Sequence, residues 1–457
     1  MREREDSLVA DTSIRTTRPG LGRTQAKQAV GGSPTLTFMI IFAIFSPIIL
    51  NLGPISLPAP RVMVLLLFIP ALVKWVSGKS GAYRLMDFIV LAFASWTLLS
   101  MMVVHGASQV EFAGANFLET FGPYLVGRWC IRNKEGFLRF VKIQFGFLIV
   151  ILPFAILESQ TGDPLIIRIL ASVFETQLII DHEIRLGLER SQAVFQHPIL
   201  YGYFAAVTLG LVLYVLNVGS GIGKSLTRFG VIFVSTFLSL SSGPLAGLVM
   251  QGLLSIWERI TRGFGFRWGI IITFIVIIYI VIDLGSSQTP FHVFVRYLTF
   301  NTGAAWNRIL IFEYGTQNLY ANPVFGIGLN DWARPSWMVS SVDNFWLATG
   351  MRHGFPALIL LLGSIFVLMI QIGRKVIHDE SIAGMRVGVN MSLIGTLFIG
   401  ATVHLWGPVY IWLWFFLGAS IWLLDDHKVD DGEDDDEEED LPAVSRRPGY
   451  TRFPAKP

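Results

Sequence analysis

Three arginines stand in two polar stretches of an otherwise apolar chain. Arg185 and Arg190 lie shortly before His197-Pro198, and Arg308 begins the second stretch, which runs to Phe355. The guanidinium group is planar, stays charged and forms paired hydrogen bonds with phosphate oxygens. These residues therefore indicate a phosphate-binding site, although each could instead contact lipid headgroups at the membrane surface.

The second stretch also carries aromatic rings and a carboxylate. Trp332, Trp337 and Trp346 offer faces that suit the C–H surfaces of sugar rings, or else anchor the chain at the membrane interface. Asp343-Asn344 stands close to the apolar segment that follows. We expect Asp343 to accept a proton from a reacting hydroxyl and Asn344 to orient it, unless Asp343 only caps a helix.

Three further residues complete the candidate set of binding residues. His353 is the second choice as a base, and His197 either binds a ligand or caps the segment that starts at Pro198. Glu119 lies within an apolar segment, where a carboxylate usually has a function or a buried partner. The alternative is a shallow segment in which Glu119 is hydrated.

The elements that must position these residues are membrane helices. The chain has 457 residues, of which 53% are hydrophobic and 15% charged, and its mean hydropathy is +0.57. Soluble domains carry about 25% charged residues. The single cysteine, Cys130, excludes an intrachain disulfide framework and a cysteine-based metal cluster. The sequence also lacks a GxxxxGK[ST] phosphate loop and an HExxH metal motif.

Repeated apolar runs predict an all-α, polytopic transmembrane bundle of about twelve spans within residues 35–424. Ser241-Ser242-Gly243-Pro244 is interpreted as a tight turn between the seventh and eighth spans, since Gly and Pro together stop a helix. The expected spans are 36–52, 61–77, 86–104, 112–129, 138–157, 198–217, 226–241, 244–257, 268–285, 353–372, 386–403 and 405–424.

The charge distribution predicts that both termini are cytoplasmic. In that orientation the short inside loops and their edges carry sixteen Lys and Arg residues, whereas the short outside loops carry only Arg61. Two long loops, near 158–197 and 286–352, then face outward and can meet over the mouth of the bundle. Residues 1–34 and 425–457 are expected to be disordered tails, the first basic and the second acidic.

The stretches Arg190–Gly202, Leu238–Leu245 and Arg308–Gly354 resemble the O-antigen ligase and O-antigen polymerase superfamily, especially its exopolysaccharide polymerase branch. The resemblance covers roughly residues 36–424. It implies metal-independent glycosyl transfer, without a cofactor, from a glycan on an undecaprenyl-diphosphate carrier. Ligase members place a His-Asn pair where this chain has Asp343-Asn344, and this difference favours a polymerase.

From this resemblance we expect a polysaccharide polymerase in the bacterial inner membrane, acting at the periplasmic face. Arg190 and Arg308, with Arg185 in reserve, would stabilise the leaving diphosphate. The expected partners are the lipid-linked oligosaccharide, membrane lipids and a chain-length regulator, and no nucleic acid is expected.

Other classes of protein fit parts of the sequence. A ligase-type enzyme would use the same donor with another acceptor. A twelve-span secondary transporter fits the span count, but its charged residues should lie at mid-membrane and its halves should be related. Here the expected spans are nearly free of Arg and Lys away from their ends. A non-catalytic scaffold for an export complex would explain the acidic tail but not the outside arginines and tryptophans.

Overall fold

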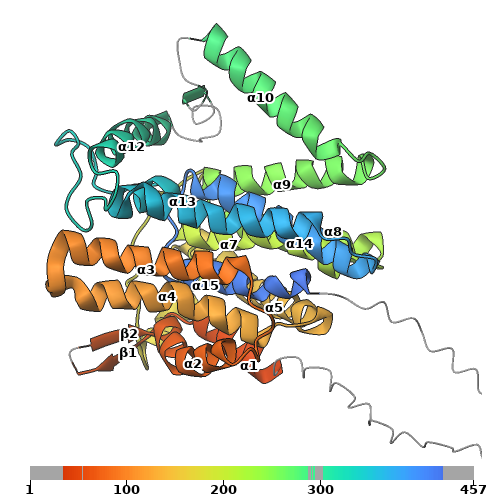
Figure 1. The fold of residues 1–457 in the computed structure, drawn as a ribbon, viewed down its shortest axis with the longest axis horizontal. Coiled ribbons are helices and arrows are strands. Elements are labelled where there is room, and N and C mark those ends of the chain that lie inside the picture. The colour runs from red at the N-terminus through yellow and green to blue at the C-terminus, as the bar shows by residue number, and fades with distance from the viewer. Residues whose placement is uncertain (1–33, 54, 287–289, 291, 294–301, 426–457) are drawn as a thin grey trace, which may run out of the picture.

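The computed structural model describes residues 34–53, 55–286, 290, 292–293 and 302–425, which are mostly helical (Figure 1). The two expected tails lie outside this part of the chain, except for Pro34 and Asp425. The longer helices are α2 (Ala59–Val76), α3 (Leu85–His105), α4 (Val110–Cys130), α5 (Lys134–Thr161), α7 (Pro198–Leu211), α8 (Ile222–Leu238), α9 (Ser242–Ile260), α10 (Arg267–Gly285), α12 (Thr302–Ala321), α13 (Phe345–Arg374), α14 (Glu380–Gly400) and α15 (Gly407–Ala419). The shorter elements are α1 (Pro34–Ile44), α6 (Leu165–Ala171), the 3-10 helices η1 (Gly106–Gln109) and η3 (Ile421–Leu424), the π-helix η2 (Val212–Leu216), and strands β1 (Ile48–Leu52), β2 (Ile55–Pro58) and β3 (Glu175–Thr176).

Eight helical segments of the described chain are long and apolar enough to cross a membrane. Nine of the twelve expected spans lie in them, because the segment Leu85–Cys130 contains both α3 and α4. The remaining three expected spans correspond to α1, α8 and α9. The shortest of these, α1, has 11 residues, too few to cross a hydrocarbon core of about 30 Å at 1.5 Å per residue.

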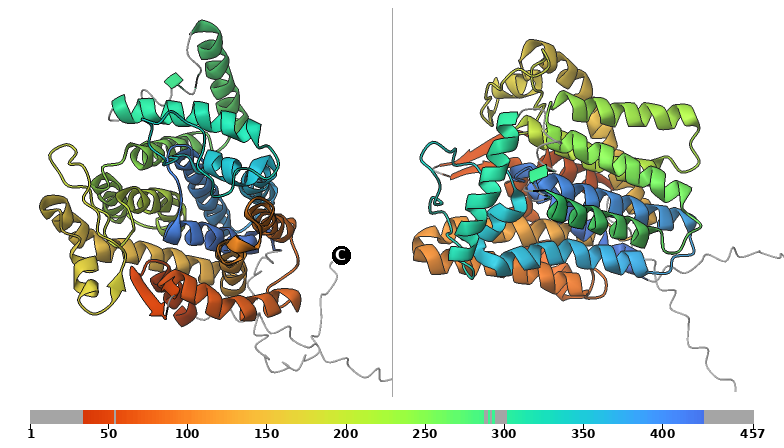
Figure 2. Two further views of the ribbon diagram at one scale, coloured as in Figure 1. Left: turned by 90° about the vertical axis from the view of Figure 1, so that its left-hand side faces the viewer. Right: turned by 90° about the horizontal axis from the view of Figure 1, so that it is seen from above.

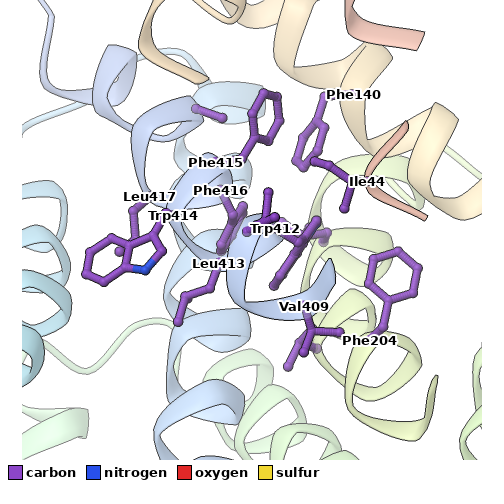
Figure 3. Close-up of a cluster of buried hydrophobic side chains, with 14 of the residues drawn as sticks. Ile44, Phe140, Phe204, Val409, Trp412, Leu413, Trp414, Phe415, Phe416 and Leu417 are labelled. Carbon is purple, nitrogen blue, oxygen red and sulfur yellow. The ribbon is translucent and has the colours of Figure 1, made fainter. Parts of the chain in front are cut away.

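Helix α15 is the centre of the bundle, because neighbours cover it on all sides. Trp412 and Trp414 are fully buried, and Figure 3 shows α15 residues beside Phe140 of α5 and Phe204 of α7. The Nε1–H of Trp412 donates to Oε1 of Gln144 at 3.1 Å, which satisfies the polar atom of this ring. Gly418 allows the backbone of α4 to lie directly against α15.

The expected first span, 36–52, is wrong as a continuous helix. Helix α1 ends at Ile44, and Pro47 follows, whose ring disfavours helical backbone in the residue before it. Strands β1 and β2 then form an antiparallel hairpin, and β3 pairs with the other edge of β1. The fold is therefore not all-α as expected, because it also contains a small three-stranded sheet.

The break between the seventh and eighth expected spans is confirmed, but it lies about three residues earlier than the expected turn. Residues 239–241 connect α8 to α9, with Leu240 at a φ of +46°. Pro244 lies in the first turn of α9, where the N–H that proline lacks has no partner inside the helix in any case.

Both expected long loops contain helix. In the first, α5 continues to Thr161 and α6 follows it. In the second, α12 lies across the end of the bundle, crosswise to the long helices, and α13 begins at Phe345 rather than at 353 (Figures 1 and 2). A satellite core fixes this region, made of Leu310, Ile311, Leu319, Trp332, Met338, Leu347 and Met351.

Ion pairs close the opposite end of the bundle. The Asp87 carboxylate accepts hydrogen bonds from Arg128, and both side chains are buried. Arg84 pairs with Asp425 at 2.7 Å, and Lys134 pairs with Asp379 at 2.9 Å. Several of the cations that predicted the inside face therefore tie helix ends together at this end.

Candidate functional site

A cavity of about 920 Å³ opens at the end of the bundle that carries α12 and the sheet. The two long connecting regions meet there with the α8–α9 turn and the α14–α15 loop. Its charged lining residues are Arg185, Arg190, Arg308, Arg352, Asp331 and Asp343. The cationic groups outnumber the carboxylates, so the cavity favours an anionic ligand.

Arg190 is held at the α8–α9 turn. Its Nε–H donates to the carbonyl oxygen of Ser239 at 3.3 Å, and its Nη2 donates to Oγ of Ser241 at 2.9 Å. Burial, followed by the nearby Arg185 and Arg308 cations, lowers the pKa of Arg190 to about 10, so it remains charged at neutral pH. Arg190 also lines the cavity, where a bound oxyanion would offset the repulsion among the three cations.

Glu158, at the end of α5, positions the segment that carries Arg190. Its carboxylate oxygens accept hydrogen bonds from the backbone N–H groups of Gln192 and Ala193, each at 2.9 Å. Ala193 adopts a φ of +53°, which is unfavourable for a residue with a side chain. The carboxylate therefore stabilises a strained turn that no pattern in the sequence indicated.

Arg308, on α12, approaches the same turn from the other side. Its Nη1 lies 3.5 Å from Oγ of Ser242, the residue after the serine that bonds Arg190. Arg185 donates to the carbonyl oxygen of Leu240 at 3.1 Å. Residues 239–242, which are the turn and the first residue of α9, thus contact all three expected arginines, and the structure brings them together in one cavity.

Asp343 lines the cavity, and the Arg308 cation acts on it electrostatically. Burial raises the pKa of Asp343, while the Arg308 cation opposes that shift. The expected alternative, in which Asp343 caps a helix, is wrong: Asn344 is the N-cap of α13, and its side chain accepts from the N–H of Leu347 at 3.0 Å. Asn344 is therefore occupied in capping, whereas the Asp343 carboxylate faces the cavity.

Only one of the three expected tryptophans lines the cavity. Trp332 does, and its Nε1–H donates to the carbonyl oxygen of Ser340 at 2.9 Å. Trp337 is 67% exposed and does not line the cavity. Trp346 packs between α13 and α14 and donates to the carbonyl oxygen of Leu397. Trp406, which was not among the expected residues, also lines the cavity.

The secondary candidates separate in the same way. His197 lines the cavity and also caps α7, since its Nδ1 accepts from the N–H of Ile199 at 3.1 Å. Burial and Arg190 lower the pKa of His197 to about 3, so it is neutral. His353 lies behind the cavity wall with its Nδ1 2.6 Å from Oγ of Ser100. Glu119 pairs with Arg61 at 2.7 Å beside a separate pocket.

The cavity is also lined by Arg352 and His404, neither of which was among the expected residues. Arg352 lies in the apolar helix α13, and its exposed side chain makes no hydrogen bond or ion pair within the described residues. His404 comes from the short α14–α15 loop. Both residues could have been selected from the sequence, because an arginine or histidine inside or beside an apolar segment usually has a function.

Comparison of the sequence with models of known protein families gives no match, and comparison with characterised proteins gives none either. The function of this chain is therefore inferred from the residues of the cavity.

Proposed function

We propose that this chain is a membrane glycosyltransferase that polymerises a polysaccharide from units carried on a polyprenyl diphosphate. The observation that carries the proposal is the cluster of Arg185, Arg190 and Arg308 opposite Asp343 in one cavity. A diphosphate leaving group needs cations where its charge develops, and the transfer needs a base for the acceptor hydroxyl.

The first turn of α9 supports this assignment. Ser242 and Gly243 line the cavity at the start of the helix, where backbone N–H groups lack partners inside it. A helix N-terminus is partly positive and binds phosphate groups. Ser241 and Ser242 also accept from Arg190 and Arg308, so this turn aligns two guanidinium groups with the helix end.

In the proposed reaction, the acceptor hydroxyl attacks C1 of the carrier-linked sugar. The bond between C1 and the diphosphate oxygen breaks, and the carrier diphosphate leaves with the electron pair beside Arg190 and Arg308. The hydroxyl proton passes to Asp343, whose raised pKa suits a group that must hold a proton briefly. Trp332 and Trp406 lie where they can contact sugar rings.

The proposed orientation places the cavity in the periplasm of a bacterial inner membrane, with both termini cytoplasmic. Helices α8 and α9 are then further spans, and α1 together with the non-helical residues after it makes the first of about twelve crossings. The end opposite the cavity carries Arg84, Arg128 and Lys134. Positive residues of this kind are enriched at the cytoplasmic face of membrane proteins, which supports this orientation. The donor is then energised by its own diphosphate, and no nucleotide is required on that side.

The test uses purified protein in lipid nanodiscs and single repeats on their diphosphate carrier, extracted from source cells that lack this gene. We expect lipid-linked chains of several repeats together with free carrier diphosphate. Transfer only after a different acceptor is added would indicate a ligase instead. Unchanged single repeats, with Arg190→Gln identical to the wild type, would contradict the proposal.

A further inference from the structure

The backbone around Arg352 is fixed from outside its own helix. Gly354 has a φ of 80° and a ψ of 177°, which breaks α13, and Pro356 lacks the N–H that would bond the carbonyl of Arg352. The N–H of Gly328 takes that place at 3.0 Å, and the N–H of Ile327 donates to the carbonyl of Met351 at 2.8 Å. Arg352 is therefore presented to the cavity from a rigid base.

His404 is the second polar group at this wall. Its ring lies 5.9 Å from the ring of Trp406, nearly parallel to it at 18°, and 5.9 Å from the ring of Phe345. Its Nδ1 is buried and has no hydrogen-bond partner within the described residues. A fixed ring with an unsatisfied nitrogen at a cavity wall is suited to bind a ligand that the protein alone does not supply.

The charged neighbours of this pair differ from those of the three arginines already described. Arg185 and Arg308 act on Arg190, and Asp343 and Arg185 act on Arg308, whereas Arg352 acts on His404. Burial, followed by Arg352, lowers the pKa of His404 to about 4, so the histidine is neutral and can donate a hydrogen bond from one nitrogen. The cavity thus has cationic groups at two places.

We propose that Arg352 and His404 form a second oxyanion subsite in this cavity, which binds an anionic group of the acceptor. The inference rests on the proposed function, because a transfer between two carrier-linked substrates brings two anionic molecules into one site. Asp331, the other lining carboxylate besides Asp343, pairs with Arg334 at 2.5 Å and leaves Arg352 available. The bound oxyanion is either the acceptor's diphosphate or the carboxylate of an acidic sugar.

The experiment measures calorimetric binding of two probes, geranyl diphosphate and methyl glucuronoside, to the full chain in nanodiscs. The variants are Arg352→Gln, Arg352→Lys, His404→Phe and Arg190→Gln, with Arg168→Gln as the matched control. Arg168 is an exposed arginine of α6 at the same end of the bundle, and it does not line the cavity. Size-exclusion profiles and thermal unfolding establish that each variant is folded.

We expect Arg352→Gln to weaken one binding event at least tenfold and to leave the event that depends on Arg190 unchanged. Loss of one of two geranyl diphosphate sites would identify the acceptor's carrier, and loss of glucuronoside binding would identify an acidic sugar. Wild-type affinity of Arg352→Gln for both probes would overturn the second subsite, as would a single geranyl diphosphate site weakened equally by Arg190→Gln. Full geranyl diphosphate binding by Arg190→Gln would instead contradict the proposed function.

Discussion

Gly326 lies directly against the backbone of Arg352: a Cβ atom on Gly326 would come within 2.4 Å of the Arg352 carbonyl carbon. Gly326 also has a φ of +69°, a left-handed conformation that costs other residues roughly 1–2 kcal/mol. The Gly-Ile-Gly sequence is thus explained by packing, since it lets the segment after α12 hydrogen-bond to the broken helix α13. This contact aligns one wall of the cavity.

Gly326→Ala should therefore destabilise the protein. The left-handed φ alone predicts a loss of roughly 1–2 kcal/mol, and the clash with Arg352 adds to it. The measurement is thermal unfolding of purified protein in nanodiscs. Gly363→Ala is the control, because Gly363 lies in α13 with open space around its Cβ position and should be neutral or slightly stabilised. Equal melting temperatures for the two variants would contradict this account.

Arg190→Lys and Arg308→Lys should each abolish most polymer while the protein still accumulates in the membrane. Lysine keeps the charge but lacks the planar guanidinium group. It therefore cannot reproduce the geometry in which Arg190 donates to Ser239 and Ser241 and can still bind a phosphate. Polymer yield is measured in cells that lack the chromosomal gene. Arg168→Lys should give the wild-type yield. Normal yield from both cavity variants would remove these arginines from the diphosphate role.

Asp343→Asn should reduce turnover roughly 100- to 10,000-fold, the usual contribution of a general base, while substrate binding persists. Stability should change little because Asn344, not Asp343, caps α13. The matched control is Asp163→Asn, which removes a carboxylate of the first connecting region that does not line the cavity. Near wild-type turnover would end the base assignment and leave the cavity histidines His197 and His404, rather than the enclosed His353, as candidates.

The pH profile gives a second measure of the same group. Burial raises the pKa of Asp343 above the ordinary 3.8. A base works in its ionised form, so the turnover rate should fall as pH decreases through that raised value, and the acid limb should lie above pH 3.8. In Asp343→Asn the residual rate should lack this limb. An unchanged acid limb in the variant would assign it to another residue.

The proposed membrane orientation predicts a labelling pattern. Cysteines at the exposed positions Ser172 and Ser340, in a Cys130→Ala background, should react with an impermeant maleimide in whole cells. A cysteine at exposed Ser77, at the opposite end of the bundle, should react only after permeabilisation. The reverse pattern would place the cavity in the cytoplasm, and labelling at Ser172 but not Ser340 would contradict the α8–α9 hairpin.

The apolar runs predicted most helices because hydrophobicity within one segment is a local property. Nine expected spans lie in helices long and apolar enough to cross a membrane, yet 36–52 was wrong because Pro47 and the turn at Gly53 redirect the chain into a hairpin. Helix α12 was missed because it is polar enough to resemble a loop, and its contacts with α13 come from residues distant in the sequence.

The site was predicted in part for a similar reason. Arg185, Arg190, Arg308 and Asp343 have side chains whose chemistry is evident from their type, and the structure places all four in one cavity. The supporting groups are common residue types, such as Glu158 and Ser241, whose role depends on which groups the fold brings next to them. Trp346 had the expected chemistry but fills space beside Gly400.

Helix α10 stands apart from the bundle, and none of its 19 residues is buried (Figures 1 and 2). Because no other described residues bury it, this helix depends on hydrocarbon as its solvent. Its length of about 28 Å matches the thickness of a typical bilayer core. Bilayer thickness and detergent chain length should therefore affect the stability of α10 more than that of any other helix of the described chain. Because α10 precedes α12 in sequence, short-chain detergents should disturb Arg308 before they loosen α15.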